Sequence, residues 1–275
     1  MASQNTSPRA PSPRAVEKST LNDGDRVILI DAKGRSYFKQ LRAGHRMTIR
    51  GTIFRADEII GTAEGCVAGD GPAAAFRVFR PTIAELVPDL PRTAEPVFAK
   101  DLGQILVHTD IRAGLSALEI GVGNGMLTIA LLGAVGEQGR LSSYEIREDF
   151  AASARSNVER HAGSSANWKI TVRDAALGLD ETDFDRAVVD LPDPVRCLDS
   201  IAGALRPGGL VGFFLPTVMQ VASLHEGLEK HPSFLYAVTR EVLERSWHVE
   251  DGSIRPDQRM IGHTGFVTTV RRSAD

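Results

Sequence analysis

The sequence predicts an α/β protein in which a small all-β domain precedes a parallel, doubly wound sheet. From about residue 105 onward, short apolar runs alternate with helical segments, as in the βαβ units of a parallel sheet. Residues 22–79 instead show period-two patterns broken by turn residues such as Lys33 and Gly34, which indicate a β-hairpin or small barrel. At 275 residues the chain is long enough for one large domain with a smaller one attached.

The composition is that of a globular protein. Hydrophobic residues make up 42% and charged residues 24%, which excludes a fibrous or wholly disordered chain. The longest apolar run, Met126 to Val135, is about half as long as a membrane span and contains Gly133, so no membrane insertion is expected. Cys66 and Cys197 lie far apart and match no metal spacing, so we expect reduced thiols, no metal site and a cytoplasmic location.

Residues 1–21 predict a disordered tail. They mix Ser, Pro and Arg and lack the apolar core that a secretory signal needs. A solubilising leader accounts for this composition, and a basic arm that touches nucleic acid is the alternative.

The predicted β-domain, residues 22–79, carries a strong local charge. Its stretch from Arg26 to Arg55 holds eight basic side chains against one acid, Asp31, so it carries +7 in a chain of net charge −3. Phosphate contacts depend on local rather than net charge, and the stretch is therefore a candidate nucleic-acid surface. The alternative is a set of strands whose solvent-facing positions happen to be basic. The basic side chains are Arg26, Lys33, Arg35, Lys39, Arg42, Arg46, Arg50 and Arg55.

Residues 80–104 hold four prolines and predict a linker that wraps onto the next domain. In that domain, residues 105–275, strand and helix signals alternate, which places ligands at the carboxyl ends of the strands. The expected strands are 115–122, 139–146, 168–175, 184–191 and 208–216, with two more, adjacent to each other, in 239–250 and 263–272. The expected helices are 125–135, 148–162, 197–207 and 221–231.

A turn with three glycines follows the first of these strands, in ALEIGVGNGMLT. Gly121, Gly123 and Gly125 stand between strand and helix, where bare backbone lets a nucleotide-like ligand approach closely. A dinucleotide fingerprint, G-x-G-x-x-G, would place the third glycine one residue later. Here Glu119 also precedes the first glycine by two residues, and this E-x-G-x-G-x-G pattern resembles the signature of class I S-adenosylmethionine methyltransferases.

Acidic residues end the next three strands. Glu145 is placed to accept hydrogen bonds from both ribose hydroxyls of S-adenosylmethionine, Asp174 to hold its adenine amino group, and Asp190 to lie near its methyl group. Simpler interpretations exist: Glu119 could satisfy nearby backbone amides, and Asp174 could cap a helix. Asp193, between two prolines, is either a turn residue or a second acid facing the same crevice.

Several short motifs, taken together, resemble those of one enzyme family. They are GDRVILIDAKGR, RPT at 80–82, KDLGQIL at 100–106, LEIGVGNGMLT at 118–128, SYEIRED at 143–149, VVDLPDP at 188–194 and RPDQRMIGHTGF at 255–266. In this order, and with the small β-domain, the chain resembles the bacterial and archaeal tRNA (adenine-N1)-methyltransferases, which methylate adenine 58 in the T-loop. The resemblance spans nearly everything after residue 22.

The resemblance implies a Rossmann-like methyltransferase domain over residues 105–275, S-adenosylmethionine as the methyl donor, tRNA as the partner and a homotetramer. It also implies that Asp190 lies between the donor and the target adenine and is the catalytic residue. The implied donor-binding residues, besides Glu119, Gly121, Gly123, Glu145, Asp174 and Asp190, are Gln104 and the backbone amides of Asn124, Gly125, Met126 and Leu127.

The chain departs from the family's pattern in three motifs. Asn124 replaces a serine in the glycine turn, Val195 stands where a tryptophan is common, and Phe98 with Ala99 replaces a tyrosine-proline pair. Because two of these departures lie toward the substrate, a methyltransferase of the same ancestry that acts on a small molecule is the alternative function. A tRNA-binding subunit without donor binding is a further alternative, which the retained glycine turn and acids oppose.

His263 and the neighbouring residues Lys100 and Asp101 have less specific interpretations. A histidine in a GHT turn before a strand is more often a structural or positioning contact than a general base. Lys100 and Asp101 form either an ion pair that pins the linker or a device that helps to close the donor pocket.

Overall fold

The computed structural model describes residues 20–69, 75–90, 96–162, 165–250 and 252–274. The chain divides into two compact units, Met1–Pro81 and Thr82–Asp275, and each is described by itself. The sequence predicts this division between residues 79 and 80, close to the observed position. Most of the expected disordered tail, residues 1–19, lies outside the described residues.

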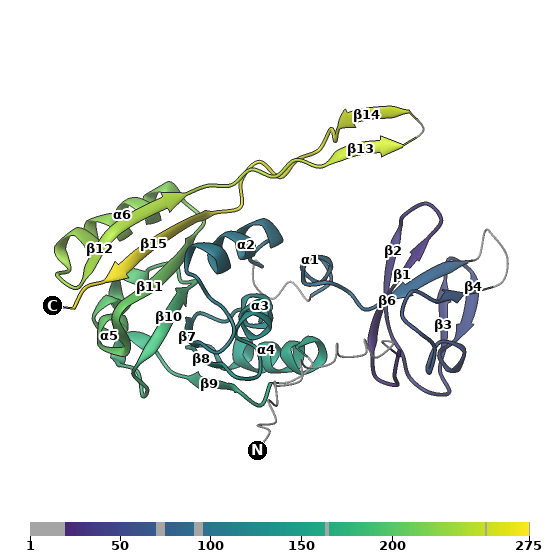
Figure 1. The fold of residues 1–275 in the computed structure, drawn as a ribbon, viewed down its shortest axis with the longest axis horizontal. Coiled ribbons are helices and arrows are strands. Elements are labelled where there is room, and N and C mark those ends of the chain that lie inside the picture. Colours follow the sequence, from purple (N-terminus) through teal and green to yellow (C-terminus); the bar gives the residue numbers. More distant parts are fainter. Residues whose placement is uncertain (1–19, 70–74, 91–95, 163–164, 251, 275) are drawn as a thin grey trace, which may run out of the picture. The chain divides into compact units, whose positions relative to one another are not determined.

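The first unit is a small all-β domain, as the period-two patterns predict (Figure 1). Its elements are β1 (Arg26–Asp31), β2 (Ser36–Gln40), β3 (Arg46–Ile49), β4 (Thr52–Arg55), the 3₁₀ turn η1 (Ala56–Glu58), β5 (Val67–Ala68) and β6 (Phe76–Phe79). Four strands form an antiparallel sheet in the order β2-β1-β6-β5, and β3 and β4 form a separate antiparallel pair. The hairpin between β1 and β2 turns at Gly34, whose φ of +74° suits glycine.

Leu21 belongs to this domain rather than to a tail. Its side chain is fully buried in the core of the domain, which also contains Leu41 and Phe54. The residue before it, Thr20, forms an isolated β-bridge with Ala63. The β-domain therefore begins before residue 22, where the sequence analysis places the end of the tail. Burying the apolar side chain of Leu21 in the core is favourable, and this residue is close enough to the first strand to reach it.

The second unit contains a seven-stranded sheet in the order β12-β15-β11-β10-β7-β8-β9. Its strands are β7 (Ser116–Ile120), β8 (Arg140–Glu145), β9 (Trp168–Val172), β10 (Phe184–Val189), β11 (Leu205–Leu215), β12 (Phe234–Arg240) and β15 (Phe266–Arg272). The five strands from β11 to β9 are parallel, whereas β15 runs antiparallel to both of its neighbours. The predicted parallel sheet is confirmed, and β15 adds an antiparallel strand near the C-terminus.

Helices cover both faces of this sheet, which confirms the doubly wound arrangement (Figure 1). They are α1 (Ile83–Leu86), α2 (Ala99–His108), α3 (Met126–Val135), α4 (Glu148–His161), α5 (Leu198–Ala204) and α6 (Val218–Lys230), with 3₁₀ turns η2 (Ala175–Leu177) and η3 (Pro194–Cys197). Side chains of α1 to α4 pack with Ala117 and Val188, and those of α5 and α6 with Leu118 and Val189. Adjacent residues of a strand point to opposite faces, so β7 and β10 contribute to both cores.

The C-terminal region differs in part from the prediction. Residues 239–250 do not form one strand: β12 begins earlier and ends at Arg240, and β13 (Trp247–Glu250) pairs with β14 (Ser253–Pro256). These two strands form a separate ribbon whose only strand partners in the described chain are each other. The helix expected over 197–207 ends at Ala204, because Leu205 already pairs with Phe184 of the central sheet. Within the described ranges, no helix is long and apolar enough to cross a membrane.

Candidate active site

The glycine turn connects β7 to α3 at the carboxyl edge of the sheet. Gly121 has a φ of +85°, and a Cβ added there would lie 2.1 Å from the backbone oxygen of Asp190. Gly125 has a φ of +86°, and its Cβ would lie 3.1 Å from Cα of Ala154 in α4. Because neither glycine carries a Cβ, the turn can pack tightly between β10 and α4. Both glycines are therefore needed for the packing of the turn itself, independently of any ligand.

Glu119 lies beneath this turn and is fully buried. Its carboxyl group accepts hydrogen bonds from the hydroxyls of Thr128, at 2.9 Å, and Ser143, at 2.5 Å. Burial raises the pKa of Glu119 to about 8, although these hydroxyl contacts oppose the rise. Glu119 thus connects β7 to α3 and β8, which is a positioning role, and its contact with the donor stays a prediction.

Glu145, at the end of β8, holds the glycine turn from the other side. One carboxylate oxygen accepts hydrogen bonds from the backbone amides of Val122, at 3.0 Å, and Gly123, at 3.3 Å. The other accepts from the backbone amide of Arg147 at 3.0 Å. The side chain is almost buried, so its carboxylate is fixed directly beside the turn, where the ribose of the donor was predicted to lie.

Asp174 follows β9 and makes the helix-capping contact that the simpler interpretation predicts, together with an ion pair that was not predicted. One oxygen accepts from the backbone amide of Ala176 at 3.0 Å and caps η2, and the other accepts from Arg196 at 3.0 Å. A cavity of about 220 Å³ opens beside Asp174, between the ends of β7 to β10. Ile120, Tyr144 and Leu191 provide its apolar lining, which suits a flat heteroaromatic ring.

Asp190 ends β10 next to the glycine turn. Its backbone amide donates to the carbonyl of Ile120 at 2.8 Å, and its side chain is half-buried. Burial raises the pKa of Asp190 to about 7, and the negative charge of Glu145 nearby adds to the rise. No group in the described part of the chain donates a hydrogen bond to this carboxylate, so its acceptor atoms are available to a ligand. Asp193 is exposed and lines the cavity beside Asp174.

Asn124 takes over local hydrogen bonding at the position of the family's serine. Its side-chain oxygen accepts from the backbone amide of Met126 at 3.1 Å, and its backbone carbonyl accepts from Asn157 of α4. Met126 and Leu127 begin α3 with buried side chains, so only their backbone faces the turn. Gln104 lies on α2, where its side-chain oxygen contacts a ring nitrogen of His108 at 3.0 Å.

Lys100, Asp101 and Thr264 form a buried polar network. The Lys100 ammonium contacts one Asp101 oxygen at 2.7 Å and the Thr264 hydroxyl at 2.5 Å, and that hydroxyl donates to the other Asp101 oxygen at 2.6 Å. Through the hydrogen bonds of Thr264, this network fastens the start of α2 to the loop before β15. This is the pinning role that the sequence left open.

His263 has a structural role in the same loop. Its Nδ1 contacts Glu241 at 2.8 Å and its Nε2 contacts the backbone carbonyl of Pro216 at 2.7 Å. Both ring nitrogens face hydrogen-bond acceptors, and these two acceptors, the carbonyl first, raise the pKa of His263. A ring held in this way is not a general base, in agreement with the prediction.

Some residues of the site were not predicted. Thr128 and Ser143 hold Glu119, and Arg196 holds Asp174. One pattern in the sequence points to Ser143. It lies two residues before Glu145 in the same strand, so both side chains point to the same face of the sheet. Val195, at the position of the family's tryptophan, packs against Gly227 of α6 rather than toward the glycine turn.

The sheet order, with one antiparallel strand next to the edge, and the acid-flanked glycine turn together define a class I S-adenosylmethionine methyltransferase. No cluster of potential metal ligands occurs among the residues that the structure describes. A family model described as the tRNA methyltransferase complex GCD14 subunit matches residues 78–264, and a TrmI-like N-terminal model matches residues 20–68. The chain belongs to this tRNA (adenine-N1)-methyltransferase family.

Individual relatives agree with this assignment. The Methanocaldococcus jannaschii protein named tRNA (adenine(57)-N(1)/adenine(58)-N(1))-methyltransferase TrmI is 30% identical over 269 residues, covering 89% of this chain and 94% of the relative. The Thermus thermophilus tRNA (adenine(58)-N(1))-methyltransferase TrmI is 31% identical over 252 residues, covering 90% and 96%.

Two solved structures are similar over almost their whole length. The tRNA (m1A58) methyltransferase TrmI of Aquifex aeolicus gives a TM-score of 0.80 at 25% identity, covering 94% of this chain and 100% of that one. A SAM-dependent O-methyltransferase of Thermotoga maritima gives a TM-score of 0.86 at 28% identity, covering 94% and 96%.

Proposed function

We propose that this protein transfers the methyl group of S-adenosylmethionine to N1 of an adenine in tRNA, at position 58 of the T-loop. The observation that carries the proposal is Asp190, a half-buried carboxylate beside the glycine turn to which no described residue donates a hydrogen bond. The family membership and the names of the relatives support tRNA as the substrate. A cytoplasmic location and a homotetramer are part of the same proposal and rest on the family resemblance.

The residues around the turn fit the methyl donor, which supplies an electrophilic methyl group on a sulfonium. Glu145 is fixed where it can accept hydrogen bonds from ribose hydroxyls, and the cavity beside Asp174 suits the adenine ring. Within the glycine turn, the backbone amides of Asn124 and Leu127 donate to no acceptor in the described residues and can bind the rest of the donor, with Gln104 on the neighbouring helix. Asp174 can still accept from an amino group, since each carboxylate oxygen has more than one lone pair.

Asp190 orients the acceptor base. Adenine N1 is a neutral nucleophile at pH 7, so its attack on the sulfonium methyl needs alignment more than a strong base. A hydrogen bond from the N6 amino group to Asp190 fixes the ring and stabilises the positive charge that methylation leaves on it. Guanine has a carbonyl oxygen at this position and is rejected. A paired adenine must first leave its stack to reach the site.

The small β-domain offers a surface for the phosphates of the RNA. The register of β3 and β4 places Arg46 directly opposite Arg55, and both are exposed. Arg50, also exposed, stands at the turn between these strands with a φ of +49°. Like charges in opposite positions destabilise a strand pair. No carboxylate in the described residues pairs with these three arginines, which suits a surface that meets a polyanion.

The test uses purified protein, labelled S-adenosylmethionine and an unmodified tRNA transcript, with nucleosides identified by mass spectrometry. We expect N1-methyladenosine that disappears when the T-loop adenine is replaced. The Asp190→Ala variant should lower kcat about 10²–10³-fold with little change in donor affinity, because it removes a contact to the reacting base. Glu137→Ala, which changes an exposed carboxylate after α3, is the matched control. Tight donor binding without RNA methylation would instead support a small-molecule substrate, and unchanged turnover in Asp190→Ala would remove this residue from the mechanism.

A further inference from the structure

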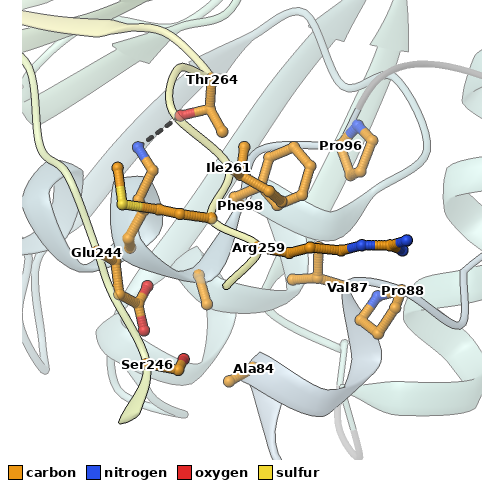
Figure 2. A pocket seen from close by; sticks show the side chains of 13 residues that line it. Ala84, Val87, Pro88, Pro96, Phe98, Glu244, Ser246, Arg259, Ile261 and Thr264 are labelled. Atoms are coloured by element: carbon orange, nitrogen blue, oxygen red, sulfur yellow. Dashed lines mark hydrogen bonds between the residues drawn. The ribbon is translucent and has the colours of Figure 1, made fainter. Parts of the chain in front are cut away.

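A second pocket, of about 430 Å³, lies on the α2 side of the catalytic unit (Figure 2). Its walls come from the end of α1, the start of α2 and the two chain segments that lead into and out of the β13–β14 ribbon. None of the glycine-turn residues or strand-end acids lines it. It is therefore distinct from the place where Asp190 and the methyl donor meet.

The lining combines an apolar wall with two charged side chains, Arg259 and Glu244, besides the paired Lys100. Phe98, Val87 and Ile261 form the wall, and 55% of Ile261 is exposed. Figure 2 shows Arg259 extending past Val87, with Glu244 on the other side of the pocket. Neither charged side chain has a hydrogen bond or ion pair to any residue that the structure describes. One ligand of moderate size can therefore contact an aromatic ring, a cation and a carboxylate together.

The pocket is built on a rigid base. Lys100 and Thr264 line it, and their buried network with Asp101 fixes the start of α2 to the loop before β15. When the walls of a pocket are fixed before a ligand binds, binding costs little free energy for ordering side chains and loops. Its size is within the range of sites that hold small organic groups.

We propose that this pocket binds one unstacked nucleobase of the RNA substrate, other than the adenine that is methylated. Single-stranded bases are typically stacked on aromatic side chains and bonded at their edges, and Phe98 and Glu244 provide these two contacts. Arg259 can form a charge-assisted bond with a neighbouring phosphate. The methylated adenine must reach Asp190, which is not part of this pocket, so the bound base is a different one. The inference rests on the proposed tRNA substrate.

The experiment combines RNA that lacks one base with protein variants of the pocket. We would prepare tRNA transcripts that each carry a single abasic nucleotide, in the T-arm or among the nucleotides that contact it, and that keep the target adenine. Methylation by the full chain would be measured as kcat/KM for each RNA at saturating donor. The variants are Phe98→Leu, which keeps an apolar side chain but removes the ring, and Arg259→Ala at the exposed rim. Arg255→Ala, an exposed arginine on the ribbon outside the pocket, is the matched control.

For one abasic position, we expect the wild-type kcat/KM to fall about 10-fold or more, as the loss of one stacked base implies. Phe98→Leu should show a similar loss on intact RNA and little further loss on that abasic RNA, whereas Arg255→Ala should behave like the wild type. If the wild type makes N1-methyladenosine but no abasic position is coupled to the pocket, the inference is overturned and the proposed function stands. If the wild type methylates no tRNA, the proposed function itself fails.

Two further measurements distinguish base binding from two other roles of the pocket. If Phe98→Leu and Arg259→Ala lower donor affinity measured by calorimetry, the pocket belongs to the donor site and the inference is wrong. If they change the oligomeric state measured by sedimentation while abasic coupling is absent, the pocket is an interface between copies of this chain. Arg259→Ala changes an exposed side chain, so it keeps the test valid should Phe98→Leu fold poorly.

Discussion

Asp190 can stabilise the positive charge that methylation leaves on the adenine only when its carboxyl group is ionised. Burial, together with the charge of Glu145, raises its pKa to about 7, so near neutral pH only part of the free protein carries the carboxylate. We therefore expect kcat/KM to rise between about pH 6 and pH 8 with a midpoint near 7, since this ratio reports the groups of the free enzyme. Glu137→Gln, which changes an exposed carboxylate after α3, should keep this profile. A profile that is flat across this range would exclude ionised Asp190 as the required group.

Gly121 is the residue at which the turn and β10 come closest. Gly121→Ala places a Cβ 2.1 Å from the backbone oxygen of Asp190 at a φ of +85°, so strain and overlap both act. We expect a loss of about 3–5 kcal/mol in the free energy of unfolding. Gly114 has a φ of +86° and open space within 4 Å of the position that a Cβ would take, so Gly114→Ala should cost only the backbone strain, about 1–2 kcal/mol. Urea unfolding of both variants tests this difference, and equal losses would contradict it.

At the scale of elements, Glu119 connects β7, β8 and α3 through a carboxyl group that burial keeps protonated. Its pKa is raised to about 8, whereas the unfolded chain has an ordinary value near 4.5. The folded state therefore binds the extra proton between these two values, and stability falls as pH rises from about 4.5 to 8. We expect Glu119→Gln to remove this part of the pH dependence, so that its stability relative to the wild type increases by a few kcal/mol toward high pH.

The check for Glu119 is urea unfolding of the wild type and Glu119→Gln at a series of pH values between about 5 and 9. Glu137→Gln, which changes an exposed carboxylate just after α3, is the control and should follow the wild type at every pH. A difference between Glu119→Gln and the wild type that does not vary with pH would show that Glu119 is ionised in the folded protein.

The elements that sequence alone predicts are those with a local signal. The glycine turn, the alternating strands and helices and the acids at strand ends depend on patterns within a few residues, and the structure has them. The contact of Ser143 with Glu119 depends instead on the register of two parallel strands, which places these residues opposite each other and leaves no local pattern. The β13–β14 ribbon was missed for a similar reason: TREVLERSWHVE is one continuous stretch, and only pairing with residues 253–256 shows where its second strand begins.

At the scale of the whole molecule, the protein has a net charge of −3 and yet is proposed to bind a polyanion. The local charge of the β-domain resolves this, because Arg46, Arg50 and Arg55 are exposed around one strand pair without a described acidic partner. Long-range repulsion is screened within about 8–10 Å at physiological salt, whereas direct phosphate contacts are retained. The first unit is therefore expected to contribute to affinity for RNA, and the second to the selection of the base.

If the arginines of the β-domain contact phosphates, the affinity for tRNA should depend on salt concentration in a predictable way. Removing one phosphate contact should lower the slope of log affinity against log salt concentration by about 0.7–0.9, so Arg46→Ala combined with Arg55→Ala should lower it by about 1.4–1.8. Fluorescence anisotropy with a labelled tRNA transcript over a range of potassium chloride concentrations measures this slope. Arg35→Ala is the control, because this guanidinium is already paired with Asp31 at 2.7 Å. If the double variant keeps the wild-type slope while donor binding is intact, Arg46 and Arg55 do not contact phosphate. The positive charge of the β-domain would then not serve to bind RNA through this strand pair.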